Sequence, residues 1–465
     1  MLCQLRNPAK SLRLFVPFAL ILLAGILQCA AANTLCVSKS ANPSCPYATI
    51  GSAVAAAAPG DTINVKPGVY KEFVTIGMSL SLVGTDPHST FIDATGLSNG
   101  VYINNSIGPV SNVLITGFTI ENANFEGILI NNASSVTIWG NRVSNNDKSL
   151  QPSPTAPVCP GLTAVYPFES NEADDCGEGI HLSSVSASII AYNTVNSNAG
   201  GILVSDDTGP THDNVIRNND VENNVMDCGI TVPSHTPFGV YHNTVSENTV
   251  INNGTSPLNG GGAGVGIFSP GGPTSNYGNA VIHNILVENG IGGVAIHTHA
   301  PGTEMLQDEQ IVGNYISGNG GDTDIGLAPT QTNGIAILIT GGKVSGIVIS
   351  QNTFDNEKED VVISTNEALS INATLNNFNQ GAIAVDNLGP APGFSGSPLV
   401  TGNASVNAVD NWWGCRAGPG AKGCATISNA VSSGPLASTV LSSPWLEMQL
   451  GDTEQEAAFP AHGPF

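Results

Sequence analysis

The sequence is poor in basic residues. Of 465 residues only 13 are Lys or Arg, against 36 Asp or Glu, and the formal net charge is −23. Proteins that bind nucleic acids or anionic membrane surfaces use cationic side chains against the phosphates. The composition therefore predicts neither a nucleic-acid partner nor a membrane partner. Disorder is excluded as well, because 41% of the residues are hydrophobic.

Long apolar runs are missing after the first 32 residues. Near the start, basic residues precede an apolar run at 14–27, and three alanines follow it. This order is typical of a secretory signal. We therefore expect residues 1–32 to be a signal peptide and the protein to be secreted, either extracellular or periplasmic. Free secretion and lipid attachment at Cys29 both remain open.

Cysteine is scarce and forms no Cys-x-x-Cys pair. Nine cysteines are present, and two of them lie in the expected signal. An oxidising export route favours disulfides over a zinc site. The predicted disulfides, which leave Cys228 unpaired, are Cys36 with Cys45, Cys159 with Cys176 and Cys415 with Cys424.

A short sequence motif, called the repeat phrase below, recurs along the chain. A Gly starts an alternating apolar strand, as in Gly127–Ile130 and Gly201–Val204, and an Asn later starts another, as in Asn193–Val195. The repeat markers are Gly117 and Asn141, Asn193, Asn219, Asn248, Asn284, Asn314, Asn352, Asn376 and Asn403. The shortest spacing between markers is about 24 residues, and the longer spacings indicate loop insertions.

Each repeat holds three strands that are too short to fold alone. Neighbouring repeats must therefore stack to bury their Ile and Val columns. The marker Asn is expected in a tight turn with left-handed backbone angles. Its amide is expected to hydrogen-bond to the Asn of the next coil, about 4.8 Å away.

Several segments resemble right-handed parallel β-helix proteins of the pectin-lyase-like superfamily, including its NosD-like and carbohydrate-processing branches. The opening segments are Cys45–Ile50, Pro59–Ile63 and Pro67–Tyr70, and the closing ones are Asn411–Gly414 and Gly418–Gly420. The resemblance implies an all-β fold, a single-stranded right-handed parallel β-helix of about ten or eleven coils. A short amphipathic N-terminal helix is expected to cap it.

The expected β-helix domain spans residues 33–446. Its N-terminal cap falls within 47–60, and its C-terminal cap, which contains three tryptophans, within 410–446. Residues 447–465 lack the repeat and are expected to be disordered. We expect a monomer.

The resemblance implies that a polysaccharide binds along the first strand of each coil, flanked by inserted loops. Alternation in the strand points His181 outward, and the repeat count places Asp207 and His235 in one column on adjacent coils. The predicted catalytic residues are His181, Asp207, Asp227 and His235. The predicted substrate-binding residues are Asp174, Asp175, Glu178, Asp206, His212, Asp213, His297 and His299.

A His beside a carboxylate can move protons near neutral pH, as sugar chemistry requires. Acid pairs such as Asp206/Asp207 and Asp174/Asp175 suit a glycosidase, or Ca²⁺ as a possible cofactor. The expected activity is that of a lyase, epimerase or glycoside hydrolase on an extracellular polysaccharide that contains uronic acid. No metal ligand is assigned.

Other functions remain open. The Asp174-Asp175 pair resembles that of polygalacturonases, but the His expected one coil later is replaced by Ala199-Gly200-Gly201. Pectate lyases use basic residues, which are scarce here. The alternatives are a non-catalytic surface or adhesion protein and a NosD-like periplasmic metal-handling protein, in which His297 and His299 hold copper or zinc.

Overall fold

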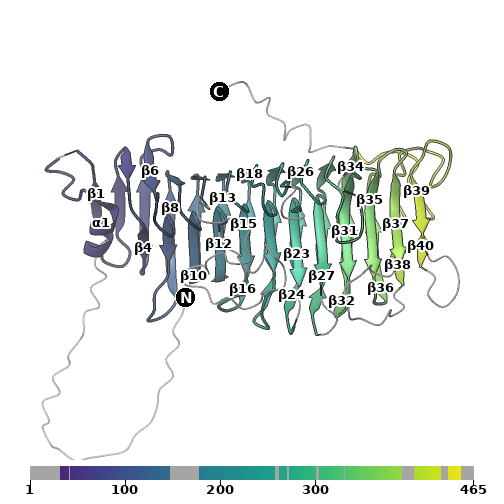
Figure 1. Cartoon of the computed structure of the whole chain (residues 1–465), viewed down its shortest axis with the longest axis horizontal. Coiled ribbons are helices and arrows are strands. Elements are labelled where there is room, and N and C mark those ends of the chain that lie inside the picture. Colours follow the sequence, from purple (N-terminus) through teal and green to yellow (C-terminus); the bar gives the residue numbers. More distant parts are fainter. Residues whose placement is uncertain are drawn as a thin grey trace, which may run out of the picture.

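The computed structural model describes residues 32–40, 42–146, 177–256, 261–269, 272–299, 303–328, 330–389, 403–430 and 438–451. Within them the chain winds into a solenoid. Its strands stack along one axis, from the single helix of the described residues, α1 (Ile50–Ala56), to β40 (Thr439–Leu441) (Figure 1). Strands of successive coils pair in parallel, as the repeat predicts.

Each coil contributes to three rows of strands. The row along which a polysaccharide is expected to bind is called the first-strand wall below. It consists of β4 (Val74–Ile76), β7 (Val101–Ile103), β10 (Ile128–Trp139), β12 (Ile180–Ser186), β15 (Ile202–Ser205), β19 (Ile230–Pro233), β23 (Val265–Ser269), β27 (Val294–Thr298), β31 (Asn333–Ile339), β35 (Glu359–Thr365), β37 (Ile383–Gly389) and β39 (Thr426–Asn429).

The second row includes the last part of β10 and consists otherwise of β1 (Thr34–Val37), β2 (Thr62–Val65), β5 (Leu80–Gly84), β8 (Val110–Thr116), β13 (Ile189–Ala191), β17 (Val215–Arg217), β21 (Thr244–Ser246), β25 (Ala280–Ile282), β29 (Gln310–Val312), β33 (Ile347–Ser350), β36 (Leu369–Thr374), β38 (Ala404–Asn407) and β40. Short strands beside this row are β16 (Thr211–His212), β20 (Val240–Tyr241), β24 (Ser275–Tyr277), β28 (Met305–Gln307) and β32 (Lys343–Ser345).

The third row is a separate sheet, with ten strands among the described residues. They are β3 (Gly68–Tyr70), β6 (Thr90–Asp93), β9 (Thr119–Glu121), β11 (Arg142–Ser144), β14 (Thr194–Asn196), β18 (Asp220–Glu222), β22 (Thr249–Ile251), β26 (Ile285–Val287), β30 (Tyr315–Ser317) and β34 (Thr353–Asp355). The inward residues of all three rows form one continuous core, because alternate residues of every strand face the axis.

A ladder of Asn side chains joins the coils at the turn between the second and third rows. In each step the Oδ1 atom of one Asn accepts from the backbone N–H and the Nδ2 of the Asn one coil earlier. The ladder runs through Asn141, Asn193, Asn219, Asn248, Asn284, Asn314, Asn352, Asn376 and Asn411. The predicted amide ladder is therefore confirmed.

Two details of the prediction are wrong. Asn403 is not in the ladder, because the step after Asn376 goes to Asn411. The left-handed backbone angles belong to the residue before each ladder Asn, such as Tyr192 (φ 56°) or Glu247 (φ 56°), and not to the Asn. The Asn side chain points inward to the amides of adjacent coils, and the residue before it makes the turn of the backbone.

Two further ladders run beside the first. Asn146, Asn198, Asn224, Asn253, Asn289 and Asn319 form one of them, which ends on Glu357. The other includes Asn214, Asn243 and Asn279 and ends on Glu309. Both additional rows follow a spacing of five residues on either side of the first ladder, as in Asn214, Asn219 and Asn224.

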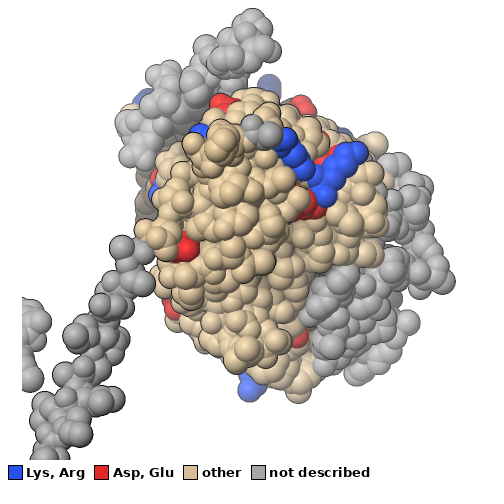
Figure 2. Space-filling view, turned by 90° about the vertical axis from the view of Figure 1, so that its left-hand side faces the viewer, with Lys and Arg blue, Asp and Glu red and all other residues tan. Residues whose placement is uncertain are grey.

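The two ends of the solenoid are closed differently. At the start, α1 buries Ile50, Ala53 and Val54, and the Glu72 carboxylate accepts from the backbone N–H groups of Ile50 and Gly51. Figure 2 shows that this end carries few charged side chains. At the other end, Trp413 is fully buried against Phe378.

The disulfides Cys36–Cys45 and Cys415–Cys424 are present, as predicted. Cys228 is a free, buried thiol. The predicted partners Cys159 and Cys176 lie outside the described residues, as do residues 1–31 of the expected signal and most of the expected tail. In the part of the chain that the structure describes, α1 falls far short of the length and apolarity of a membrane-spanning helix.

Removal of one ladder amide should destabilise the fold. Asn248 accepts two hydrogen bonds from Asn219 and donates to Ile216 O and Asn284 Oδ1, each at 3.0 Å. Asn248→Ala leaves these buried groups unpaired, so we expect a loss of roughly 2–4 kcal/mol in urea denaturation. The exposed Asn372→Ala on β36 is the control, with a change under about 0.5 kcal/mol. Equal effects of the two variants would contradict a supporting role for the ladder.

The carboxyl group that ends the second ladder should make stability depend on pH. Burial raises the pKa of Glu357 to about 8, despite hydrogen bonds from Asn319. Because this folded-state pKa exceeds the unfolded value, the contribution of Glu357 to the stability of the fold is full at low pH and is lost as the pH rises through 8. Glu357→Gln should therefore raise the melting temperature at pH 9 more than at pH 5. A shift that is the same at both pH values would contradict this assignment.

Candidate functional site

Titratable side chains from consecutive coils meet on the outer side of the first-strand wall. On β12, Ile180 and Leu182 face the core, so His181 faces away from it. Its backbone pairs with Leu129 and Leu203 of the adjacent coils. His181 is nevertheless fully buried, because neighbouring side chains cover it.

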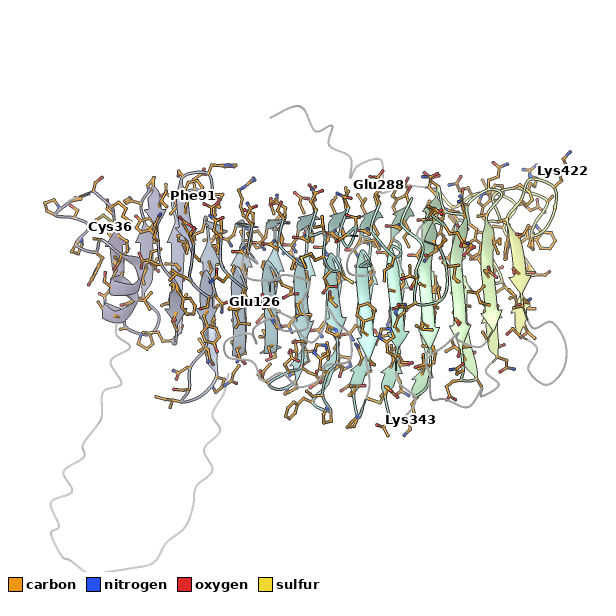
Figure 3. The ribbon with its side chains drawn as sticks, viewed as in Figure 1. Cys36, Phe91, Glu126, Glu288, Lys343 and Lys422 are labelled. Atoms are coloured by element: carbon orange, nitrogen blue, oxygen red, sulfur yellow. A yellow bond between two sulfur atoms is a disulfide. The ribbon has the colours of Figure 1, made fainter. Side chains whose placement is uncertain are left out.

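A hydrogen-bonded network centres on His181. Its Nδ1 lies 3.0 Å from Glu126 Oε1, and its Nε2 lies 2.9 Å from Ser205 Oγ and 3.7 Å from Asp207 Oδ2. The Ser205 hydroxyl donates to Asp207 Oδ2, and Asp207 Oδ1 lies 2.7 Å from His235 Nδ1. Figure 3 shows Glu126 on the wall, away from both ends. Asp207 is thus held between two histidines, and the predicted Asp207–His235 neighbourhood is present.

The network favours positive charge on the histidines and negative charge on Asp207. Burial alone would lower the pKa of His181, but the charge of Glu126 and the contacts with Asp207 raise it to about 10. Burial would raise the pKa of Asp207, but the charge of His235 and the hydrogen bonds from both histidines hold it well below its ordinary value. The pKa of His235 is raised, since Asp207 outweighs burial. These shifts favour a carboxylate at Asp207 and protonated rings at His181 and His235.

Two buried carboxyl groups stack at one side of His181. Glu126 and Glu178 lie on adjacent coils, and Glu178 O accepts from Gly127 N–H at 3.1 Å. Burial raises the pKa of both, and the charge of Glu126 raises that of Glu178 further. The uncharged form of Glu178 is therefore favoured, and its side chain is buried inside the wall and not exposed as a substrate ligand would be.

Asp227 and Glu178 both lie close to Gly200. A Cβ at Gly200 would lie 3.2 Å from Glu178 Oε1 and 3.3 Å from Asp227 Cβ, so no larger residue fits between them without a shift. Asp227 Oδ1 accepts from Cys228 N–H at 2.6 Å, and burial raises its pKa. Asp227 is 9% exposed, so it lies at the edge of the wall, as does the Asp207 side chain at 10%.

Asp206 is a turn residue, contrary to its predicted substrate contact. Its Oδ1 accepts from the backbone N–H groups of His235 and Thr236, and its Oδ2 accepts from Ser234, Thr236 and Gly239. The side chain is fully buried. Its role is to hold the 234–239 loop against its own coil, which places His235 beside Asp207.

His212 and Asp213 lie on β16 and just after it, at the surface beside the wall. His212 Nδ1 lies 2.8 Å from Asp213 Oδ2, and their side chains are 29% and 58% exposed. The His212 ring stacks on Tyr241, which stacks on Tyr277, with ring centroids 4.8 and 4.7 Å apart. They form a surface stack that is separate from the hydrogen bonds of His181.

His297 and His299 form a second cluster on the wall, at β27. His297 Nε2 lies 2.8 Å from Asp322 Oδ2, and His297 Nδ1 lies 3.1 Å from His299 Nε2. Asp324 Oδ2 lies 3.7 Å from His299 Nε2. Both histidines are nearly buried, under the ring of Phe268.

The expected acid pairs do not assemble a calcium site in the described residues. Ca²⁺ needs several converging oxygens, whereas the oxygens of Asp206 are taken by its turn and those of Asp207 by serine and histidine. Asp174 and Asp175 lie outside the described residues. Calcium therefore stays a prediction.

Four residues of these clusters were not predicted from the sequence: Glu126, Ser205, Asp322 and Asp324. A signal existed for Glu126, because Glu126 and Glu178 each directly precede the Gly of a repeat phrase. In a β-helix such residues share a column. Asp322 and Asp324 lie in an inserted loop, where the repeat count gives no register.

Residues 88–263 match the family described as "Right handed beta helix region". The fold is therefore a right-handed parallel β-helix, as the sequence resemblance implies. No curated protein matches the chain by sequence.

Solved structures with a similar fold have different described activities. An alginate lyase from Paenibacillus sp. str. FPU-7 is 15% identical over 71% of this chain and 95% of its own, with a TM-score of 0.46. The mannuronan C-5 epimerase AlgE4 A-module of Azotobacter vinelandii is 13% identical over 75% and 93%, with a TM-score of 0.43. PfbA, a surface adhesin of Streptococcus pneumoniae, is 14% identical over 72% and 86%, with a TM-score of 0.43. Likeness at this level concerns the fold alone.

The His181 ring should remain doubly protonated in weakly alkaline solution. Its pKa of about 10 depends on Glu126 and Asp207, which outweigh the opposing effect of burial. Nitrogen-15 NMR of the histidine rings at pH 8 should show an imidazolium for His181. Glu126→Gln should lower its pKa, because an attractive charge is lost. A neutral His181 ring at pH 8 in the unmodified protein would contradict the proposed charge distribution.

Proposed function

We propose that the chain is a secreted glycoside hydrolase that binds a polysaccharide along the first-strand wall and uses Asp207 and Asp227 as its catalytic carboxyl groups. The observation that carries the proposal is the position of Asp207, which two histidines hold at the edge of the wall. Asp227 follows on the next coil, and it too is slightly exposed.

Glycoside hydrolysis needs two carboxyl groups in opposite protonation states. The histidines keep Asp207 ionised, whereas burial raises the pKa of Asp227 and favours its protonated form. Asp227 would then protonate the glycosidic oxygen as its bond to the anomeric carbon breaks, and the Asp207 carboxylate would attack that carbon. His181 is a positioning residue, since it is fully buried behind Asp207.

The same charges disfavour elimination and epimerisation. Both reactions begin when a base removes a proton at C5 of a uronate, and a base must be unprotonated at the working pH. His181 stays protonated up to about pH 10, and the low pKa of Asp207 makes it a weak base. The proposed hydrolysis does not depend on uronic acid in the substrate, because a hydrolase can cleave either neutral or acidic chains.

Export is part of the proposal. The disulfides Cys36–Cys45 and Cys415–Cys424 suit an oxidising compartment. The wall offers a long linear surface with a repeat of about 4.8 Å per coil, which suits a polymeric substrate. For an exported protein this substrate would be a polysaccharide outside the cytoplasm.

Removal of either carboxylate should abolish hydrolysis. The protein would be assayed on neutral glucans and fructans, polygalacturonate and alginate, by reducing ends and by the absorbance of unsaturated uronates. Asp207→Asn and Asp227→Asn should each lower the release of reducing ends about 100- to 10,000-fold. Asp355→Asn, an exposed position on the third row, is the matched control and should keep full activity.

Each other outcome rejects the proposal in a specific way. Unsaturated products would identify a lyase, and C5 inversion without cleavage an epimerase. Binding without any chemical change would identify a surface or adhesion protein. Full activity of Asp207→Asn, with an unchanged melting temperature, would remove this carboxylate from the mechanism.

A further inference from the structure

The second cluster of the wall has the geometry of a metal site. Three side-chain atoms converge there: His297 Nδ1, His299 Nε2 and Asp324 Oδ2. The two nitrogens are 3.1 Å apart, and the carboxylate oxygen lies 3.9 Å from His297 Nδ1 and 3.7 Å from His299 Nε2. The three atoms lie within 4.8 Å of one another. We propose that these three residues bind one Zn²⁺ ion.

The size of the triangle admits zinc, and its donor atoms select this ion. The nearest point equidistant from all three atoms lies at about 2.1 Å from each. Zinc binds imidazole nitrogen at about 2.0–2.1 Å and carboxylate oxygen at about 2.0–2.2 Å. Ca²⁺ takes oxygen ligands at about 2.3–2.6 Å, and Mg²⁺ prefers oxygen donors. Two imidazoles with one carboxylate therefore fit zinc better than either hard cation.

The surroundings orient the ligands for this role. Asp322 Oδ2 lies 2.8 Å from His297 Nε2 and accepts a hydrogen bond from its N–H, so the lone pair of His297 Nδ1 points to His299. A carboxylate on the distal nitrogen is the usual support of a metal-binding His. Asp322 is itself held, because its N–H donates to Asn333 Oδ1 and its Oδ1 accepts from Asp324 N–H.

The Asp324 side of the cluster faces solvent, which leaves room for a fourth ligand. The Asp324 side chain is 46% exposed, whereas the ring of Phe268 covers the histidines from the adjacent coil. Three protein ligands with one open position are typical of zinc sites that bind a water molecule or a ligand oxygen. The inference is independent of the proposed hydrolase, because neither Asp207 nor Asp227 belongs to this cluster.

Zinc binding can be measured directly on the full chain. After treatment with a chelator and dialysis, titration calorimetry and elemental analysis should give one Zn²⁺ per chain. His299→Ala and Asp324→Asn should each weaken binding at least 100-fold. Asp322→Asn should weaken it about 10- to 100-fold, as for other supporting carboxylates. Asp324 is partly exposed, so its variant tests the site without disturbing a buried pair.

Matched variants and a second metal distinguish this site from other histidines of the chain. His283→Asn replaces an exposed His with a residue that accepts its left-handed backbone (φ 54°), and it should bind Zn²⁺ as the unmodified chain does. Co²⁺ should give the intense visible spectrum of a four-coordinate site, which His299→Ala should lose. Absence of stoichiometric Zn²⁺ overturns the proposal. So does binding that survives His299→Ala but is lost in His181→Gln, which would place the ion near Glu126 and Glu178.

Discussion

Parallel stacking in a fixed register is the constraint on which the whole molecule depends. Coils of very different length meet at the same three turns, and at each turn an amide accepts from the backbone and side chain of the coil before it. These buried bonds are costly to leave unmade. A slip of one coil by one residue would leave the amides without partners and turn the Ile and Val columns outward.

The site is a direct product of that register. His181, Asp207 and His235 are separated in sequence by 26 and 28 residues, yet their side chains form one row, because each lies on the next coil. The Ser205 hydroxyl links His181 to Asp207, and Asp207 contacts His235 directly. The buried Asp206 holds the 234–239 loop in place. The proposed catalytic side chains on loops thus gain the rigidity of the sheet beneath them, which a mechanism based on accurate carboxyl positions requires.

Much of the fold could be predicted because single Gly and Asn residues mark the same positions in each coil. The Gly phrases locate the first strands, and Asn193, Asn219 and Asn248 locate the turns. His181, Asp207 and His235 could be brought together by counting along the repeat. Asp206 could not be distinguished from Asp207 in this way, since counting gives the position of a residue in the coil but not the direction of its side chain in a turn. Asp322 and Asp324 were also beyond reach, because their inserted loop has no counterpart in other coils.

The amide ladders run one way only. In every bond between two ladder amides the oxygen points to the preceding coil and the N–H donor belongs to that coil, from Asn141 to Asn411 in the longest row. Side-chain carbonyl dipoles in such a row add as peptide dipoles do in a helix. The solenoid therefore has electrical polarity, with its positive end toward the C-terminus. Lengthening by duplication of a coil preserves this polarity, whereas an inverted coil could not join the stack.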